Sequence, residues 1–429
     1  MNAVISNLKD FVTEATSPYH VVAKSKQILD ENGFTELPFG SAWSLEQGGR
    51  YYTIPYGTTL YAFTIGNEPS NLPSLRIATA HTDHPCFHVK PLPEMKEHSY
   101  LKINTETYGG PIINTWLDRP LSVAGKVCLK SDVIMQPKTV LFDAKVPLLT
   151  IPNLAIHINR EVNKGVELNK QTDINPLIGL INQTLNEKSY FVEYLARELQ
   201  VEADEILDFD LTIYCCEEPS TIGMNQEFFS SPRLDNLTSV VACLNGIIRD
   251  TNEKDIHVIA LYDNEEIGSR TKQGADSSLT SMLLEKIYTG IGHGRANLYN
   301  AYFNSMILSV DVAHCLHPNF IGKNDPTSYC ELGKGIVFKL DSTQKYAYDT
   351  EAIAILEQIC HAHDVSYQKF VNRSDATSGS TLGSLISSWI PIKTVDIGVP
   401  LLAMHSAREL MGTQDQMELE KVIDGFFQV

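Results

Sequence analysis

The sequence predicts an α/β protein in which one domain is interrupted by an inserted β-rich domain. Three observations favour this fold. In the later half of the chain, short apolar runs alternate with helical stretches, as in an α/β domain. Between residues 100 and 158 the runs are β-type and broken by Gly and Pro. Strand-like runs also precede this block. We therefore expect residues 1–92 and 208–429 to fold together around an insertion of residues 93–207.

Local patterns predict the individual elements in order. Mixed helical periodicity indicates a helical segment over residues 7–32, and a second helix is expected near residues 191–199. Short runs rich in β-branched and aromatic residues indicate strands. We expect such strands at residues 51–54, 59–63, 75–80, 123–127, 139–142, 148–151, 211–214, 256–262, 306–310 and 394–398.

Charge and composition exclude several classes of partner. The chain has 34 Lys and Arg against 52 Asp and Glu, a net charge of −18, which argues against nucleic acids and anionic membranes. No run approaches the ~20 apolar residues of a membrane span. The first 14 residues lack an apolar signal core, and the eight cysteines form no Cys-x-x-Cys pair. We therefore expect a cytoplasmic protein with reduced thiols.

The most informative feature is a pair of adjacent glutamates, Glu265 and Glu266, at the end of the predicted strand over residues 256–262. Two carboxylates at the mouth of a buried strand are costly unless a positive charge neutralises them. A metal ion would do so, and one carboxylate could remain free to act as a base. The alternative is an acidic helix start, because Asp and Glu favour a first helical turn.

Other predicted strands end in similar residues. One runs into His81 and Asp83, another into Asp311, and residues 394–398 precede His405. Asp235 lies in a Pro- and Asn-containing loop just ahead of an apolar stretch. Because ligands of open α/β sheets bind beyond the carboxyl ends of the strands, these side chains should form one site.

This set supports a two-metal hydrolytic site. The candidates are two imidazoles and three carboxylates, which exceed the three protein ligands of one catalytic zinc. Two divalent ions fit if a carboxylate, most economically Asp235, bridges them. The spare glutamate would take a proton from water and pass it to the leaving amine. If Glu265 and Glu266 are extended they point in opposite directions, but spacing does not say which one ligates. The candidates are His81, Asp235, Glu265 or Glu266, Asp311 and His405.

Asp83, two residues after His81, is placed to accept the other imidazole N–H and fix its tautomer.

Ordered motifs from about Ser17 to Arg408 also resemble the signatures of the M18 aspartyl aminopeptidase family. Nearly the whole chain is covered, and the motifs follow family order. They are His81-Thr82-Asp83, Trp116-Leu117-Asp118-Arg119, Pro232-Arg233-Leu234-Asp235-Asn236, Asp263-Asn264-Glu265-Glu266-Ile267-Gly268-Ser269, Asp311-Val312-Ala313-His314 with His317-Pro318-Asn319, and Met404-His405-Ser406-Ala407-Arg408-Glu409.

The resemblance implies a mixed-sheet, zinc-exopeptidase-like catalytic domain interrupted by an inserted β-rich dimerisation domain. It implies a tetrahedral homo-oligomer, usually of twelve subunits, with two Zn²⁺ per subunit. Mn²⁺ or Co²⁺ could substitute, since carboxylate and imidazole sites accept them. It also implies Glu265 as the base and Asp235 as the bridge between the ions. The implied ligands are His81, Asp235, Glu266, Asp311 and His405.

The resemblance also implies residues that contact substrate. His157 resembles a histidine that reaches a neighbouring subunit's active site; its alternatives are a third histidine ligand or an interface or packing residue. Lys339 and Tyr346 resemble the stretch that holds an acidic substrate side chain, with an ordinary surface lysine as the alternative for Lys339. His314 resembles a residue that contacts bound substrate.

The sequence departs from the family pattern at two places. Pro120 follows Asp118-Arg119, where an acidic residue is usual. Residues 373–379 differ from the usual Asn-Asp-x-Pro-Cys-Gly motif and lie near the expected specificity region. Neither departure touches a proposed ligand, so only strict aspartyl preference is put in doubt.

The sequence thus predicts a metal-dependent aminopeptidase that acts on peptides with a free N-terminus and favours N-terminal Asp or Glu. One alternative is an aminopeptidase of broader or neutral specificity. Another is a dizinc deacylase or carboxypeptidase on a related scaffold. A third alternative is a non-catalytic scaffold. It would carry substitutions at the metal-ligand or base positions, and the sequence shows none.

Overall fold

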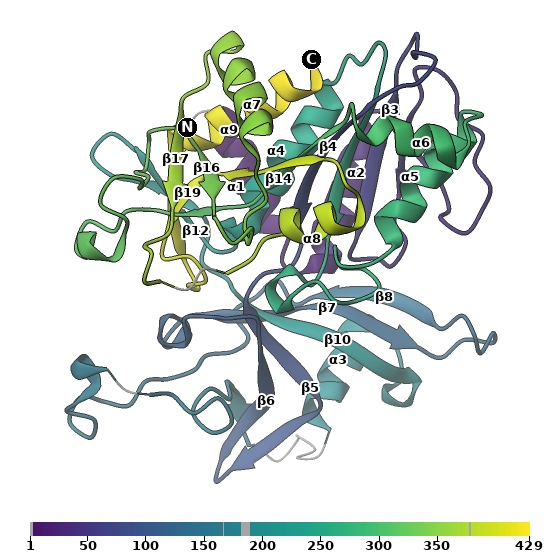
Figure 1. Ribbon diagram of the computed structural model, residues 1–429. Coiled ribbons are helices and arrows are strands. Elements are labelled where there is room, and N and C mark those ends of the chain that lie inside the picture. The colour runs from purple at the N-terminus through teal and green to yellow at the C-terminus, as the bar shows by residue number, and fades with distance from the viewer. Residues whose placement is uncertain (1–2, 166, 182–188, 377–378) are drawn as a thin grey trace. The chain divides into compact units, whose positions relative to one another are not determined.

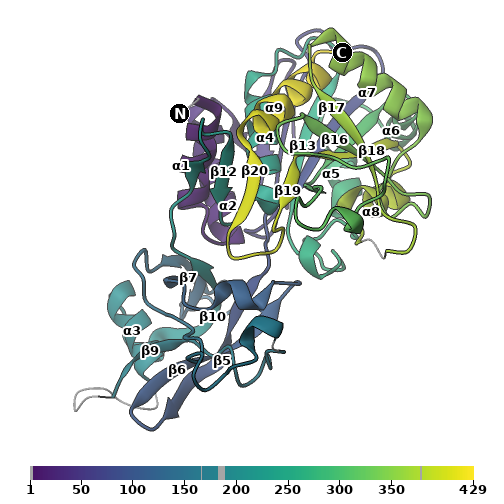
Figure 2. The ribbon, with the colours of Figure 1, turned by 90° about the vertical axis from the view of Figure 1, so that its left-hand side faces the viewer.

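The computed structural model describes residues 3–165, 167–181, 189–376 and 379–429, which form two compact units (Figures 1 and 2). The first unit comprises Met1–Asp83, Pro219–Met404 and Glu409–Val429. The second comprises His84–Glu218 and His405–Arg408. Among the described residues, no helix is both long and apolar enough to cross a membrane.

A nine-stranded mixed sheet organises the first unit. Its central strands β13, β4, β14 and β18 run parallel to one another, so their carboxyl ends share one edge of the sheet. In spatial order the strands are β1 (Thr35–Glu36), β2 (Arg50–Thr53), β3 (Leu60–Ile65), β13 (Ile256–Tyr262), β4 (Leu75–His81), β14 (Met306–Val310), β18 (Lys393–Gly398), β16 (Ile336–Leu340) and β17 (Tyr367–Val371).

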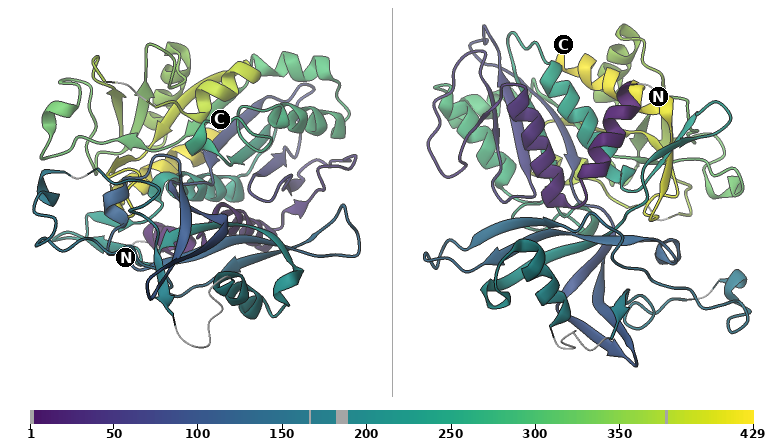
Figure 3. Two further views of the ribbon diagram at one scale, coloured as in Figure 1. Left: turned by 90° about the horizontal axis from the view of Figure 1, so that it is seen from below. Right: turned by 180° about the vertical axis from the view of Figure 1, so that it is seen from behind.

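Helices cover both faces of this sheet. Along β13, Ile259 and Leu261 join one hydrophobic cluster while Val258 and Ala260 join the other, as the two-residue period of a strand requires. The first cluster receives α1 (Ala3–Glu14), α2 (Pro18–Glu31), α4 (Leu234–Arg249), α7 (Thr350–Ala362) and α9 (Thr413–Phe427). The second receives α5 (Leu279–Gly290), α6 (Arg295–Tyr302) and α8 (Leu382–Trp389). The view from behind shows the purple α1 and α2 side by side (Figure 3).

The predicted helical segment over residues 7–32 is in fact two helices. Ser17 has extended backbone, and its side chain accepts the backbone N–H of His20, which caps α2. Pro18 occupies the first helical position, where a missing N–H costs nothing. The Ser-Pro pair therefore ends one helix and begins the next.

A smaller sheet and several short turns complete the first unit. The sheet joins β11 (Ser220–Ile222), β12 (Phe228–Ser231), β20 (Glu409–Gly412), β19 (Pro400–Leu402) and β15 (Ala313–His314). The 3₁₀ turns of this unit are Glu265–Ile267 and Ile321–Lys323. β20 begins at Glu409, which contacts the predicted metal ligand Asp235.

The second unit is built on an antiparallel six-stranded sheet. In spatial order its strands are β8 (Lys138–Asp143), β7 (Leu121–Leu129), β10 (Ile206–Cys215), β5 (Cys86–Glu97), β6 (Tyr100–Tyr108) and β9 (Leu177–Leu180). Helix α3 (Tyr190–Leu199) contributes Phe191 to its core, beside Phe87 and Trp116. The 3₁₀ turns of the second unit are Ile113–Trp116, Val162–Lys164 and Ala203–Glu205. The predicted boundary at residue 207 falls inside β10. The strand predicted at residues 148–151 is reduced to two isolated bridges, one at Leu149 and one at Thr150.

Candidate active site

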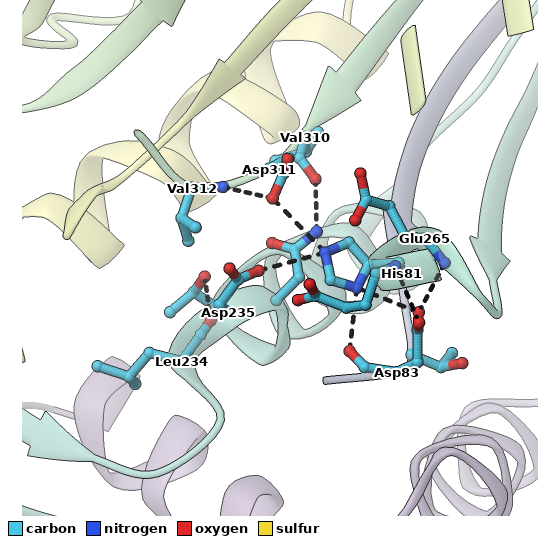
Figure 4. Close-up of polar contacts among 12 residues, drawn as sticks. His81, Asp83, Leu234, Asp235, Glu265, Val310, Asp311 and Val312 are labelled. Atoms are coloured by element: carbon cyan, nitrogen blue, oxygen red, sulfur yellow. Dashed lines mark hydrogen bonds and ion pairs between the residues drawn. The ribbon is translucent and has the colours of Figure 1, made fainter. Parts of the chain in front are cut away.

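The candidate site lies at the carboxyl ends of the parallel strands (Figure 4). His81 is the last residue of β4, and Asp311 follows β14. Glu265 and Glu266 follow β13 after a two-residue turn, while Asp235 belongs to the first turn of α4. The sheet order therefore brings together residues that the sequence spreads over more than half of the chain.

His81 is the centre of this cluster. Its Nε2 lies 3.2 Å from Asp235 Oδ1 and 3.6 Å from Asp311 Oδ1. Its Nδ1 lies 3.0 Å from the Asp83 carbonyl oxygen and 3.4 Å from Asp83 Oδ1. Asp83 thus fixes the ring from one side, and Nε2 faces the two carboxylates, as a ligand nitrogen would.

The two glutamates are not on extended backbone, which corrects the sequence-based argument about how they point. They lie in a 3₁₀ turn that begins after Asn264, whose φ is 63°. The backbone N–H groups of Glu265 and Glu266 each donate to a carboxylate oxygen of Asp83 at 3.1 Å. Asp83 therefore holds both His81 and the glutamate turn.

His81, Asp235 and Glu266 fit a metal ion by their own geometry. Each offers one ligand atom, and the three atoms lie within 4.8 Å of one another. One imidazole nitrogen and two carboxylate oxygens form a donor set that suits Zn²⁺. Asp311, which also faces His81 Nε2, can add a further oxygen to this set.

The electrostatics of the glutamates also fit a cation. Both side chains keep some accessible surface, but their carboxyl groups are largely buried among protein atoms. Burial raises the pKa of Glu265 to about 8, with help from the negative charges of Asp311, Asp83 and Asp235. Burial and the negative charges of Asp235, Glu265 and Asp83 raise the pKa of Glu266 well above its usual value. A divalent cation would offset this accumulation of negative charge.

Lys339 lies next to the carboxylate cluster. Its side chain is 2% exposed, and its Nζ lies 3.3 Å from Asp311 Oδ2. Nζ also donates to the Val312 carbonyl at 3.1 Å and lies 5.2 Å from the centroid of the Tyr346 ring. Burial would raise the pKa of Asp311, but Lys339 and His81 hold it below the usual value. Lys339 is therefore a buried cation beside the site, not a surface lysine.

Tyr346 and His314 lie at different depths. Tyr346 is buried, and its hydroxyl accepts from Asn372 Nδ2 at 3.4 Å. His314 is exposed on β15, and its ring meets Phe370 edge-on at a centroid distance of 6.4 Å.

Two predicted residues belong to the second unit. His405 has a φ of 67°, and its Nδ1 lies 3.1 Å from the Gly110 carbonyl oxygen. His157 is exposed in a turn. Within the divergent segment of residues 373–379, Thr377 and Ser378 lie outside the described residues.

Sequence reasoning missed two buried carboxylates near the site. Glu409 accepts the backbone N–H of Asp235 at 3.1 Å, and Asp396 lies on β18 beside Lys339. A charged residue in the apolar run over residues 393–398 was the available signal for Asp396. Glu409 belongs to a recognised motif, but the sequence assigned it no role.

Comparisons with known proteins agree with this geometry. The model of the family "Aminopeptidase I zinc metalloprotease (M18)" matches residues 11–427. A probable M18 family aminopeptidase 2 of Clostridium acetobutylicum is 45% identical over 98% of this chain and 97% of its own. Its namesake in Clostridium novyi is 44% identical over 98% of each chain.

Solved structures show the same fold. The crystal structure of prApe1 superposes with a TM-score of 0.93 at 28% identity, covering 99% of this chain and 94% of its own. The mApe1 dodecamer of S. cerevesiae gives a TM-score of 0.86 at 28% identity, over 99% and 96% of the two chains. The predicted α/β fold and zinc-dependent hydrolase activity are thereby confirmed. The chain belongs to the M18 family of zinc-dependent aminopeptidases.

Proposed function

We propose that this aminopeptidase removes acidic N-terminal residues, Asp and Glu, from peptides with a free N-terminus. The observation that carries the proposal is Lys339, a buried ammonium group 3.3 Å from Asp311 at the edge of the carboxylate cluster. On a chain of net charge −18, recognition of an acidic side chain requires a local cation. Two of the three ammonium hydrogens have partners in Asp311 and Val312, which leaves one for a substrate carboxylate.

The metal centre in this proposal contains two Zn²⁺ ions, with Mn²⁺ or Co²⁺ as substitutes. Asp235 would contribute ligand oxygens to both ions. Bound ions would supply a more acidic water and would favour negative charge on the oxygen of the scissile carbonyl. The residues that would hold the ions are His81, Asp235, Glu266, Asp311 and His405.

Glu265 is the general base in this proposal. Its carboxyl group lies beside the ligands, and its backbone N–H is held by Asp83. Burial raises its pKa to about 8. Bound cations would lower this pKa, so the carboxylate would be ionised near neutral pH and still basic enough to accept a proton. It can therefore take a proton from the attacking water and deliver it to the leaving amine. Asp83 positions both this turn and the His81 ring.

The proposal includes assembly into dimers and a tetrahedral dodecamer. A solved M18 neighbour is described as a dodecamer, and the exposed position of His157 suits contact with another subunit. His157 would reach the active site of that subunit. Mixing His157→Ala with Glu265→Gln subunits should then restore activity, because intact groups from different chains can meet. Without rescue in confirmed mixed oligomers, a role for His157 in its own subunit or as a ligand would be favoured.

Metal analysis alongside a panel of amino-acid anilides tests the proposal. We expect two zinc ions per subunit and the highest kcat/KM with N-terminal Asp or Glu. N-acetylation of a peptide substrate should abolish turnover, whereas a deacylase or carboxypeptidase would still act on it. A preference for Leu over acidic residues would show a neutral specificity and would contradict the role of Lys339.

A further inference from the structure

A second buried carboxylate, Asp396, lies beside Lys339 and has no part in the proposed chemistry. It is fully buried in the middle of β18. Asp396 is the register partner of Lys339 on the antiparallel strand β16. Directly opposed residues place their side chains on the same face of a sheet, with Cβ atoms about 4.5–5.5 Å apart. The carboxylate of Asp396 therefore runs alongside the stem of the lysine.

Protein atoms enclose this carboxylate. Asp396 Oδ2 accepts the backbone N–H of Ala347 at 2.5 Å. Gly383, at the start of α8, leaves so little room that an added Cβ would lie 2.7 Å from the same oxygen. Burial raises the pKa of Asp396, whereas Lys339 and the hydroxyls of Ser309 and Thr381 favour the ionised form. Asp396 can therefore act on substrate only through its neighbours.

Lys339 needs more negative charge than Asp311 can supply. A buried ammonium is stable only when it is paired and hydrogen-bonded. Asp311 is itself a proposed metal ligand and also faces His81, so its charge is shared. Both Asp311 and Asp396 favour the charged form of Lys339 and keep its pKa above the usual value, although burial alone would lower it. Asp396 is the carboxylate that serves Lys339 without also serving the metal centre.

The same carboxylate also holds the neighbouring aromatic residue in place. Ala347, whose N–H it accepts, directly follows Tyr346. The Tyr346 ring lies under the Lys339 ammonium at 5.2 Å. A single buried carboxylate thus supplies negative charge to Lys339 and holds the backbone next to Tyr346.

We propose that Asp396 is a positioning residue for acidic specificity, which aligns Lys339 and Tyr346 for the carboxylate of an N-terminal Asp or Glu. This inference rests on the proposed preference for acidic residues. It adds that the selectivity of the enzyme depends on a carboxylate that the substrate does not touch.

A double-mutant cycle tests the inference. Asp396→Asn keeps an acceptor for Ala347 but removes the charge. We expect it to lower kcat/KM for N-terminal Glu about tenfold, mainly through KM, with kcat/KM for Ala within about twofold of wild type. In a Lys339→Met background, Asp396→Asn should change the Glu-to-Ala ratio by less than about twofold, because the residue through which it acts is gone.

Thermal unfolding of the same four proteins provides a readout independent of substrate. Each single variant should lower the unfolding midpoint, since each leaves a buried charge with less compensation. The double variant should be at least as stable as Lys339→Met, because Asp396→Asn removes the carboxylate that has lost its cation. Additive losses in the midpoint would overturn the electrostatic coupling between Asp396 and Lys339.

Asp250→Asn is the matched control. The Asp250 side chain is also buried, and its Oδ1 lies 3.0 Å from His257 Nδ1. It lies beside the start of β13, at the opposite end of that strand from Glu265. This control should lower stability without changing the Glu-to-Ala ratio.

Equal losses for Glu and Ala substrates in Asp396→Asn would reduce the residue to a structural role and overturn the inference. A wild-type enzyme without acidic preference would instead contradict the proposed specificity, and the inference would fall with it. Retained preference in Asp396→Asn would contradict the inference alone.

Discussion

Replacement of Lys339 by Met gives the sharpest test of substrate recognition. Met keeps most of the volume of the lysine stem but removes the ammonium. In the native protein this group contacts Asp311 at 3.3 Å and Val312 at 3.1 Å, and its side chain is 2% exposed. An acidic substrate would lose a charge-assisted hydrogen bond in a largely desolvated position, whereas a neutral substrate would lose no partner.

The expected size of the effect follows from that geometry. A hydrogen bond to a charged group contributes about 1.5–3 kcal/mol, which is roughly a ten- to hundredfold change in kcat/KM. The variant should also be less stable, because removal of one member of a buried ion pair costs about 3–5 kcal/mol. Kinetics should therefore be measured well below the unfolding midpoint of the variant.

The assay compares kcat/KM for Asp, Glu, Leu and Ala anilides in wild type, Lys339→Met and Lys334→Met. Lys334 is an exposed lysine in the same stretch of chain, so its replacement should leave the selectivity unchanged. A selective loss for Asp and Glu in Lys339→Met alone is the predicted result. Equal losses for acidic and neutral substrates would refute the role of Lys339 in recognition.

Two further predictions concern stability. Gly398→Ala should destabilise the protein, because an added Cβ would lie 1.8 Å from the Asp311 carbonyl oxygen. The loss in unfolding free energy should exceed the typical cost of overpacking, about 1–3 kcal/mol. At Gly40 an added Cβ meets nothing within 4 Å, so the control Gly40→Ala should change the unfolding free energy by less than about 0.5 kcal/mol. Burial would lower the pKa of His88, but Asp210 and Cys86 together raise it to about 10. The contribution of His88 to stability is therefore complete below about pH 6.5 and is lost as the pH rises toward 10. His88→Gln should flatten this part of the stability profile in thermal unfolding, and an unchanged slope would contradict the ion pair.

The sequence predicted the site where local pattern and sheet order agree. β13 is a short apolar run that ends just before Glu265 and Glu266, and β4 and β14 are similar runs that end near His81 and Asp311. Because parallel strands place their carboxyl ends at one edge, the grouping of these residues could be inferred without coordinates.

Features that depend on register could not be predicted in this way. The run over residues 336–340 reads as an apolar strand, and nothing local shows that β16 runs antiparallel to β18 and opposes Lys339 to Asp396. The 3₁₀ turn at Glu265 likewise depends on a left-handed Asn264 and on the acceptor Asp83, which is distant in sequence.

The proposed chemistry depends on Glu265 as the base and Glu266 as a metal ligand. Zinc content and kcat measured together on Glu265→Gln and Glu266→Gln test it most directly. Glu265→Gln should keep two zinc ions per subunit and lose about 100- to 10,000-fold in kcat, because the base is gone while ligation survives. Glu266→Gln should lose zinc, since its carboxylate lies within 4.8 Å of the ligand atoms of His81 and Asp235. Zinc loss in Glu265→Gln, with full zinc in Glu266→Gln, would contradict the account by reversing the two roles.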